Sequence, residues 1–248
     1  MNQYLETAIE AAKIAGALLR DNYETELVVD ALHDHDIKLE LDVRAQDLIT
    51  ECLLGAFPDH ALYGEEGIAG NLDSDWQWVV DPIDGTVNYF YGIPHFCVSI
   101  ALRHKKEIVI GVIYDPMADS LWAVEKGGKP TLNGKEIQTS SREQLKDTVM
   151  TIGFSKTKES MDAGLQRYKK LAYKVRKTRM MGSAALALAY ISCGRLDAYI
   201  EETISLWDVA AGILLVEAAG GKIELTSIEN SEDKFSIKAT NGRVMIED

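Results

Sequence analysis

The stretch WVVDPIDGT at residues 78–86 leads an apolar run into two aspartates that stand three residues apart. Pro82 stiffens the chain between them, because its ring fixes φ, and Gly85 permits a tight turn. Such a turn can bring Asp81 and Asp84 to one side of the chain, facing one ion. Magnesium binds oxygen ligands, usually one or two carboxylates with water and phosphate. We therefore predict a carboxylate metal site where this strand ends, although a single D-x-x-D also occurs in ordinary turns.

Helical and strand patterns alternate on either side of this stretch. Apolar residues recur at three- and four-residue steps over 2–23, which predicts an amphipathic helix, and further helices are predicted at 43–57, 158–176, 183–193 and 207–219. Short β-branched and aromatic runs between turn residues predict strands at 61–64, 76–83, 96–103, 107–115, 120–125, 148–153, 197–202, 222–225 and 235–240. Asn133-Gly134 predicts a tight turn, and Gly220-Gly221 a left-handed helix cap. The alternation predicts layered helices and sheets.

Length and composition limit the class of protein. The chain has 248 residues, 46% hydrophobic and 26% charged, so it can form a packed core of ordinary globular composition. The purest apolar run, 96–102, has the length of a strand and not that of a bilayer span. The polar start lacks the features of a secretory signal, so we expect a cytoplasmic location. A net charge of −13 disfavours nucleic-acid binding through a basic face.

Two further acidic blocks accompany the stretch at 78–86. Gly64-Glu65-Glu66-Gly67 ends an apolar segment, and Trp207-Asp208 opens a helix that continues with Ala210-Ala211-Gly212. In this order and at this spacing, the three blocks resemble the signature of the inositol monophosphatase family. Further similar blocks extend the resemblance over nearly the whole chain: Gly182-Ser183-Ala184-Ala185, Asp197-Ala198-Tyr199 and Glu217-Ala218-Ala219-Gly220-Gly221.

The resemblance implies a set of metal ligands. Asp81, Asp84 and Asp208 resemble the carboxylates that share one magnesium ion. Glu65, Asp81 and the carbonyl of Ile83 resemble the ligands of a second ion. A third, weaker ion in such enzymes also depends on Glu65, so the resemblance implies two or three Mg²⁺ ions in each active site.

Catalytic and phosphate-binding roles follow from the same resemblance. Glu65 and Thr86 would orient the water that attacks phosphorus, and Asp42 would hydrogen-bond Thr86 from behind. Gly85 and Thr86 would offer backbone amides to the phosphate at a helix start, where the dipole favours an anion. Because metal ions acidify water and neutralise the phosphate, no covalent phosphoenzyme is required.

The substrate pocket implied by the resemblance is lined by Gly182, Ser183, Ala184 and Glu201, with Glu201 accepting hydrogen bonds from sugar or inositol hydroxyls. Other interpretations stay open here. Gly182 and Ser183 also fit a plain helix N-cap, and Glu201 fits a solvated strand end. A shift of one residue in the alignment would point to Glu202 instead.

The implied fold is an α/β (α+β) layered αβαβα sandwich of the sugar-phosphatase type. Residues 1–142 would form an N-terminal α+β half with most metal ligands, and residues 143–248 a C-terminal α/β half that completes the site. The implied reaction is hydrolysis of a small phosphomonoester, with inositol monophosphate first, by a metal-activated water. Related enzymes are commonly homodimers, and we expect no nucleic-acid or membrane partner.

Alternatives remain for both substrate and class. Similar scaffolds hydrolyse fructose 1,6-bisphosphate, 3′-phosphoadenosine 5′-phosphate, NADP or histidinol phosphate. A non-catalytic protein-binding adaptor is an alternative of another class, because bacterial members of this family also bind transcription machinery. The complete set of predicted ligands favours an enzyme.

The chain departs from the family pattern at residues 36–42. Leu39 stands where the family typically has a threonine, and Ala31 where it has a lysine. The lid near 27–40, the third ion and lithium sensitivity are therefore open, with Lys38 as a candidate replacement for the missing positive charge. For residues 33–36 we expect a solvated acidic loop, with a zinc or nickel site as the alternative.

Overall fold

The computed structural model describes residues 2–33, 36–154, 158–229, 231 and 233–246. Its described helices are α1 (Gln3–Asp21), α2 (Glu40–Ala56), α3 (Thr86–Phe90), α4 (Lys158–Ala172), α5 (Ala184–Ser192) and α6 (Leu206–Ala218), with a 3-10 turn η1 (Leu145–Asp147). The first sheet has the spatial order β10 (Lys135–Glu136), β9 (Thr131–Leu132), β8 (Ser120–Glu125), β7 (Glu107–Asp115), β6 (Cys97–His104), β5 (Trp76–Asp84), β3 (Ala61–Gly64) and β4 (Gly67–Gly70). The second has the order β12 (Lys177–Arg179), β11 (Val149–Ile152), β13 (Ala198–Ser205), β15 (Lys234–Thr240) and β14 (Lys222–Ser227). Strands β1 (Val29–His33) and β2 (Asp36–Leu39) form a separate pair.

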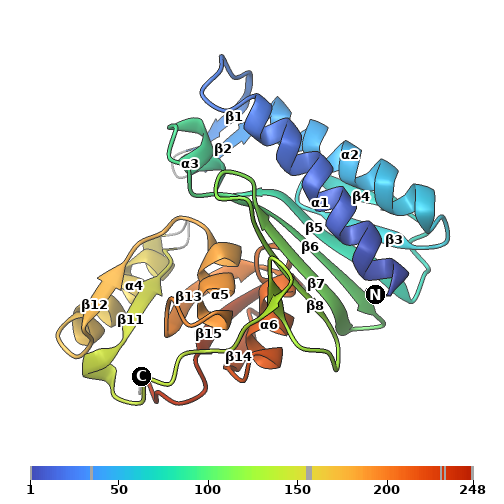
Figure 1. The fold of residues 1–248 in the computed structure, drawn as a ribbon. Coiled ribbons are helices and arrows are strands. Elements are labelled where there is room, and N and C mark those ends of the chain that lie inside the picture. The colour runs from blue at the N-terminus through green and yellow to red at the C-terminus, as the bar shows by residue number, and fades with distance from the viewer. Residues whose placement is uncertain (1, 34–35, 155–157, 230, 232, 247–248) are drawn as a thin grey trace.

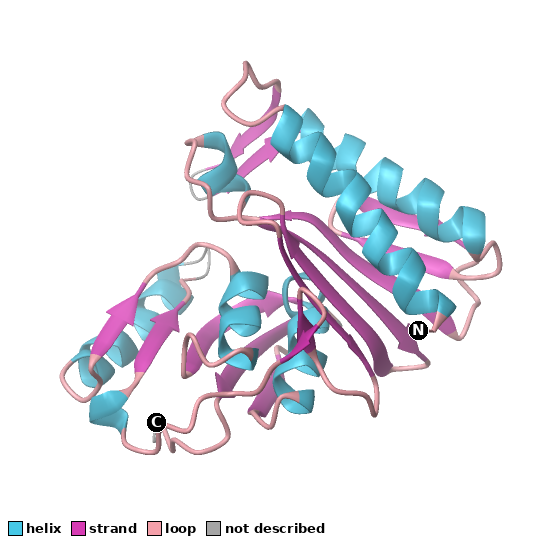
Figure 2. Ribbon diagram, viewed as in Figure 1, coloured by secondary structure: helices cyan, strands magenta, loops and turns pink. Residues whose placement is uncertain are grey.

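These elements stack in five layers, which Figures 1 and 2 show from one side. Helices α1 and α2 lie side by side over one face of the eight-stranded sheet, and α6 packs on its other face with α5 beside it. The five-stranded sheet lies beyond α5 and α6, with α4 on its outer face. This order confirms the predicted αβαβα sandwich.

The two middle helices are buried because a sheet covers each side of them. Along β13 the side chains alternate: Tyr199 packs with α5 and α6, whereas Ala198 and Ile200 pack with residues of α4. Burying one leucine-sized side chain in such a layer contributes roughly 1.5–3 kcal/mol. Leu188 of α5 is fully buried in this layer, so Leu188→Ala would cost roughly 2–5 kcal/mol.

A bulge near the end of β5 decides where its aspartates point. Opposite β6, Asp81 pairs with Ser99 and Asp84 with Cys97, so β5 holds one more residue than β6 between these pairs. In a regular strand, residues three apart point to opposite faces of the sheet. The extra residue of a bulge reverses this alternation. The bulge therefore supplies what the sequence alone suggested a turn would do, and both aspartates reach the same side.

Both turn signals predicted from glycine are confirmed. Asn133 and Gly134 have φ values of +49° and +75° and join β9 to β10. Gly220 follows α6 with φ +91°, and the N–H of Gly221 donates to the carbonyl of Val216 at 2.8 Å. This is the hydrogen bond of a left-handed helix cap.

Part of the segment considered as a lid is a strand pair. Residues 29–33 and 36–39 form the antiparallel pair of β1 and β2. Residues 34 and 35, and the side chains of residues 30–36, lie outside what the structure describes. The predicted acidic loop or metal site at 33–36 therefore stays a prediction. The division of the chain at 1–142 and 143–248 also stays a prediction.

Candidate active site

One cavity of about 460 Å³ gathers the predicted site residues from segments far apart in the sequence. They come from the ends of β3 and β5, from α3, from the starts of α5 and α6, and from β13. Eleven of the twelve line this cavity, namely Glu65, Asp81, Ile83, Asp84, Gly85, Thr86, Gly182, Ser183, Ala184, Glu201 and Asp208. The twelfth, Asp42, lies behind Thr86 and accepts a hydrogen bond from it.

Three of these carboxylates form a cluster that fits one cation. One oxygen each from Asp81, Asp84 and Asp208 lies within 4.8 Å of the others. Asp81 is 1% exposed and Asp84 7% exposed. Asp208 is the third residue of α6, where its Oδ2 accepts the N–H of Ser205 at 2.9 Å. The helix start thus delivers a carboxylate from the second half of the chain to the two at the end of β5.

The buried carboxylates of the cluster repel one another, which favours binding of a cation between them. Burial raises the pKa of Asp81 well above its usual value, and repulsion from Glu65, Asp84 and Asp208 raises it further. A bound divalent cation would offset this repulsion. The donor set therefore fits a cation.

Carboxylate chemistry favours magnesium over softer metals at this cluster. The sulfur of Cys97 lies 3.8 Å from Oδ2 of Asp84 and donates a hydrogen bond to it. Burial raises the pKa of the Cys97 thiol well above its usual value, so the group stays protonated and is a poor metal ligand. Oxygen ligands alone are what magnesium prefers.

Asp84 also joins the end of β5 to the start of α5. Its Oδ2 accepts hydrogen bonds from the Ser183 hydroxyl at 2.5 Å and the Ala185 N–H at 2.7 Å. Its Oδ1 accepts the Ala184 N–H at 3.2 Å. Ser183 meanwhile caps α5 by accepting the N–H of Leu186 at 3.2 Å. Ser183 is therefore an N-cap and a cavity residue at once, so the two interpretations of this position are compatible.

The predicted pair of Thr86 and Asp42 is present. The Thr86 hydroxyl lies 2.9 Å from the Ile83 carbonyl and 3.3 Å from Oδ1 of Asp42. Oδ2 of Asp42 accepts the N–H of Leu39 at 2.8 Å, at the start of α2. Burial raises the pKa of Asp42 to about 7. The position of Thr86 is thus fixed by groups behind it.

Gly85 is required where β5 turns into α3. Its φ is +103°, a region that disfavours residues with a side chain. A Cβ at this position would also lie 3.1 Å from the carbonyl oxygen of His95 and 3.2 Å from that of Gly182. The missing side chain lets these three backbone segments meet beside the acidic cluster.

Glu201, and not Glu202, lines the cavity. Glu201 is 9% exposed, and Tyr199 donates its hydroxyl proton to Oε2 of Glu201 at 2.5 Å. A Cβ at Gly153 would overlap the Glu201 carboxylate, so this glycine makes room for it. Glu202 instead pairs with Arg167 of α4 at 2.9 Å. Sequence reasoning missed Gly153 as a neighbour of this carboxylate, because nothing local links it to Glu201. Tyr199 was also missed, although residues two apart in the predicted strand point to the same face.

Lys38 brings a positive charge near the cavity, as its position in the segment 36–42, which departs from the family pattern, suggested. It forms an ion pair with Glu66, the neighbour of the cavity residue Glu65. Leu39 is fully buried in the core beneath α1 and α2. The residue that replaces the family's threonine is therefore a packing residue, which explains why an apolar side chain is tolerated there.

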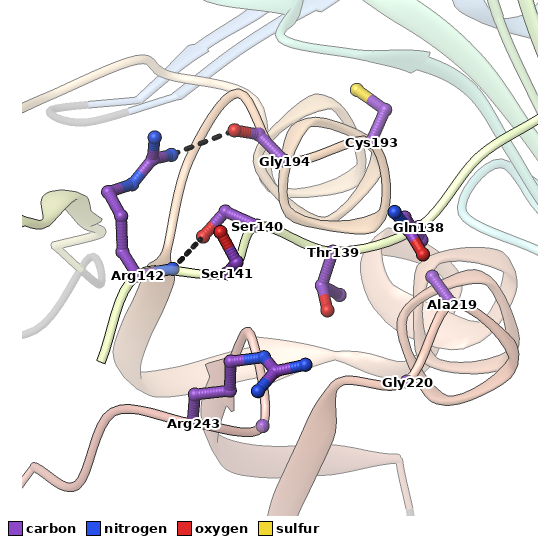
Figure 3. A pocket seen from close by; sticks show the side chains of 11 residues that line it. Gln138, Thr139, Ser140, Ser141, Arg142, Cys193, Gly194, Ala219, Gly220 and Arg243 are labelled. Carbon is purple, nitrogen blue, oxygen red and sulfur yellow. Dashed lines mark hydrogen bonds between the residues drawn. The ribbon is translucent and has the colours of Figure 1, made fainter.

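A second hollow, of about 760 Å³, lies at the opposite ends of α5 and α6 (Figure 3). Its charged described lining residues are Arg142 and Arg243. Arg142 donates to both carboxylate oxygens of Asp197, at 2.8 and 2.9 Å, and to the Gly194 carbonyl at 2.8 Å. None of the predicted site residues lines this hollow. The charge of Arg142 at this hollow is neutralised by Asp197.

Within the described residues, no helix is long and apolar enough to cross a bilayer.

The sequence matches known proteins over nearly its whole length. The profile of the inositol monophosphatase family matches residues 1–245. The chain is 40% identical to inositol monophosphatase 2 of Solanum lycopersicum over 247 residues, which are 96% of this chain and 92% of the relative. It is 37% identical to the Nus factor SuhB of Escherichia coli (strain K12) over 250 residues, covering 99% and 94% of the two chains.

The fold matches solved structures as well. The crystal structure of the extragenic suppressor protein suhB from Bartonella henselae superposes with a TM-score of 0.90, at 33% identity, over 98% of this chain and 95% of that chain. These matches confirm the resemblance predicted from the acidic blocks. They also confirm that the chain is a phosphatase. The chain belongs to the inositol monophosphatase family.

Proposed function

We propose that the chain hydrolyses phosphate monoesters of small polyols with Mg²⁺ as its cofactor, and that inositol monophosphate is the first substrate to test. The observation that carries this proposal is the buried cluster of Asp81, Asp84 and Asp208 in a cavity large enough for a small molecule. Family membership supports a metal-dependent phosphatase that acts on small phosphorylated substrates.

In this proposal, Asp81, Asp84 and Asp208 hold one magnesium ion. Glu65, Asp81 and the Ile83 carbonyl hold a second, and Glu65 contributes to a third where one binds. Glu65 lines the same cavity and raises the pKa of Asp81 by repulsion, which supports its place beside the cluster. When bound, Mg²⁺ neutralises the phosphate and lowers the pKa of water toward neutrality.

The protein's own groups bind and orient the reactants. Glu65 and Thr86 orient the attacking water, and the Asp42 carboxylate holds the Thr86 hydroxyl in place. The backbone amides of Gly85 and Thr86 bind phosphate oxygens. Glu201 accepts hydrogen bonds from substrate hydroxyls and is itself held by the Tyr199 hydroxyl. Asp42 and Tyr199 are thus positioning residues, because they act through other side chains.

Other substrates on similar scaffolds remain alternatives in this proposal: fructose 1,6-bisphosphate, 3′-phosphoadenosine 5′-phosphate, NADP and histidinol phosphate. We also propose a homodimer and a cytoplasmic enzyme. A protein-binding adaptor is the candidate of another class, because some relatives carry the name Nus factor SuhB. The complete set of carboxylates in the cavity favours catalysis over a purely adaptor role.

A phosphate-release screen over these substrates, with and without Mg²⁺, tests the proposal. We expect release from at least one small phosphomonoester only when Mg²⁺ is present. Asp208→Asn should abolish it, whereas the control Glu217→Gln, which changes an exposed residue of the same helix, should not. Release that is independent of metal, or that survives Asp208→Asn, would contradict the proposal. Recovery of a stable protein partner by a wild-type protein without phosphatase activity would favour the adaptor.

A further inference from the structure

One positively charged side chain lines the active-site cavity in addition to the acidic cluster. The described lining residues include one basic side chain, that of Lys234 at the start of β15. They also include five carboxylates, those of Glu65, Asp81, Asp84, Glu201 and Asp208. Asp81 is 1% exposed and Asp84 7%, whereas Lys234 is exposed to solvent. Lys234 therefore stands toward the mouth of the cavity and the aspartates at its floor.

The backbone ties Lys234 to the helix that carries Asp208. In the antiparallel pair of β13 and β15, Lys234 stands opposite Ser205, the N-cap residue of α6. The carbonyl of Asp233 accepts the N–H of Leu206 at 2.9 Å, which anchors the start of β15 to the start of α6. The root of the Lys234 side chain is therefore held at a set place relative to the Asp208 carboxylate.

No described residue pairs with the Lys234 ammonium group. Two other lysines of the same sheet, Lys222 and Lys238, both form ion pairs with Glu224, at 2.8 and 2.9 Å. Glu201, the cavity carboxylate on β13, is already held by the Tyr199 hydroxyl. An ammonium without a partner, at the mouth of a cavity that takes phosphorylated molecules, is suited to bind an anion.

We propose that Lys234 binds a second phosphoryl group of the substrate, remote from the one that is cleaved, so that the enzyme prefers bisphosphates to the matching monophosphates. This inference rests on the proposed function, because it takes the acidic cluster as the site of the cleaved phosphate. A second phosphate at the mouth finds no other basic side chain among the described lining residues. Among the candidate substrates, Lys234 therefore favours fructose 1,6-bisphosphate and 3′-phosphoadenosine 5′-phosphate over inositol monophosphate.

Steady-state kinetics on matched substrates test this preference. The pairs are fructose 1-phosphate with fructose 1,6-bisphosphate, and inositol 1-phosphate with inositol 1,4-bisphosphate. We expect Lys234→Gln to lower kcat/KM for the bisphosphates about 10-fold, mainly through KM, because a charge-assisted hydrogen bond is lost. The monophosphates should change less than about 2-fold on the same grounds. Lys234→Arg should keep most of the preference, and Lys222→Gln serves as the control for an exposed lysine outside the cavity.

Two kinetic results would overturn the inference. One is an equal effect of Lys234→Gln on both members of each pair, which would indicate a general change in the field of the cavity. The other is a wild-type enzyme that shows no preference for the bisphosphates.

Calorimetric binding separates this inference from the proposed function. Fructose 1-phosphate and fructose 1,6-bisphosphate are titrated into the wild type and Lys234→Gln with Ca²⁺ in place of Mg²⁺. Tighter binding of the bisphosphate that disappears in Lys234→Gln supports the role of Lys234, even if no turnover is found. Equal affinities for the two ligands in the wild type reject that role, even if phosphomonoesters are hydrolysed.

Discussion

Two fully buried aspartates, Asp81 and Asp197, differ in how their charge is compensated. Asp197 receives the guanidinium of Arg142 on both carboxylate oxygens, the hydroxyl of Ser140 at 2.5 Å and the N–H of Val149 at 2.7 Å. Asp81 instead faces three further carboxylates of the cavity. A buried charge with a complete set of donors holds the structure together. One surrounded by like charges marks a place where a ligand must supply the compensation.

The largest expected effect falls on turnover when a charge of the cluster is removed. Asp208→Asn keeps an oxygen that can still cap the Ser205 N–H, so the fold should survive, while activity should drop on the order of 10³-fold. Asp84 is less suitable for this test, because its two oxygens accept three strong hydrogen bonds from the start of α5. Phosphate release and urea unfolding of the same samples separate the two effects.

The opposite outcome is expected at Asp197. Asp197→Ala leaves the Val149 N–H without its acceptor and removes the partner of Arg142, whose side chain is 37% exposed, so the unfolding free energy should fall by roughly 1–3 kcal/mol. Activity per folded molecule should stay close to that of the wild type, because Asp197 does not line the active-site cavity. Urea denaturation gives both the stability and the folded fraction, and phosphate release gives the activity. A stable but inactive Asp197→Ala protein would break the contrast between the two aspartates.

The effect of pH on the metal-free protein should sharpen the contrast. Burial raises the pKa of Asp81 well above its usual value, and that of Asp42 to about 7. The folded protein therefore retains protons that the unfolded chain releases near pH 4. The stability that these bound protons provide is fully present below about pH 4. It is lost as the pH rises through the pKa values of Asp81 and Asp42 in the folded protein.

Thermal unfolding at pH 5.5 and pH 8 checks this expectation. The Tm of the metal-free protein should be lower at pH 8 than at pH 5.5. Mg²⁺ should raise Tm more at pH 8, by about 4 °C if binding adds one to two kcal/mol to the free energy of unfolding. Asp81→Asn should raise the metal-free Tm at pH 8 and reduce the response to Mg²⁺. An equal response to Mg²⁺ at both pH values in the wild type would argue against carboxylate ligands.

A smaller effect is expected from crowding Glu201. Gly153→Ala places a methyl group where the Glu201 carboxylate lies, so the side chain must turn away from the Tyr199 hydroxyl. We expect KM for the preferred substrate to rise about 10-fold, because one hydrogen bond to a charged group is lost, with kcat nearly unchanged. Gly55→Ala, at a glycine with open space around it, is the matched control. An unchanged KM would remove Glu201 from substrate binding.

The sequence predicted the layers because their signals are local, and it predicted the members of the cavity through the resemblance to the family. The apolar run before Asp81, the turn at Asn133-Gly134 and the cap at Gly220 each depend on neighbouring residues. The bulge between Asp81 and Asp84 could not be predicted, since it depends on how β5 pairs with β6.

Contacts between segments far apart in the sequence could not be predicted from local patterns either. The space that Gly153 leaves for Glu201, and the position of Lys234 opposite Ser205, arise only when β11, β13 and β15 assemble. Leu39 looked like a lost polar group of the lid, but the structure shows it as a core residue. Long-range register and packing therefore decide details of the site that the family signature does not carry.

Crystals of the wild-type protein soaked in Mn²⁺, a substitute for Mg²⁺ with strong anomalous scattering, give the most direct test that the carboxylates hold divalent cations. We expect an anomalous peak between Asp81, Asp84 and Asp208, and its loss in crystals of Asp208→Asn. A map without a peak at these three side chains, with Mn²⁺ bound elsewhere on the chain, would contradict this expectation.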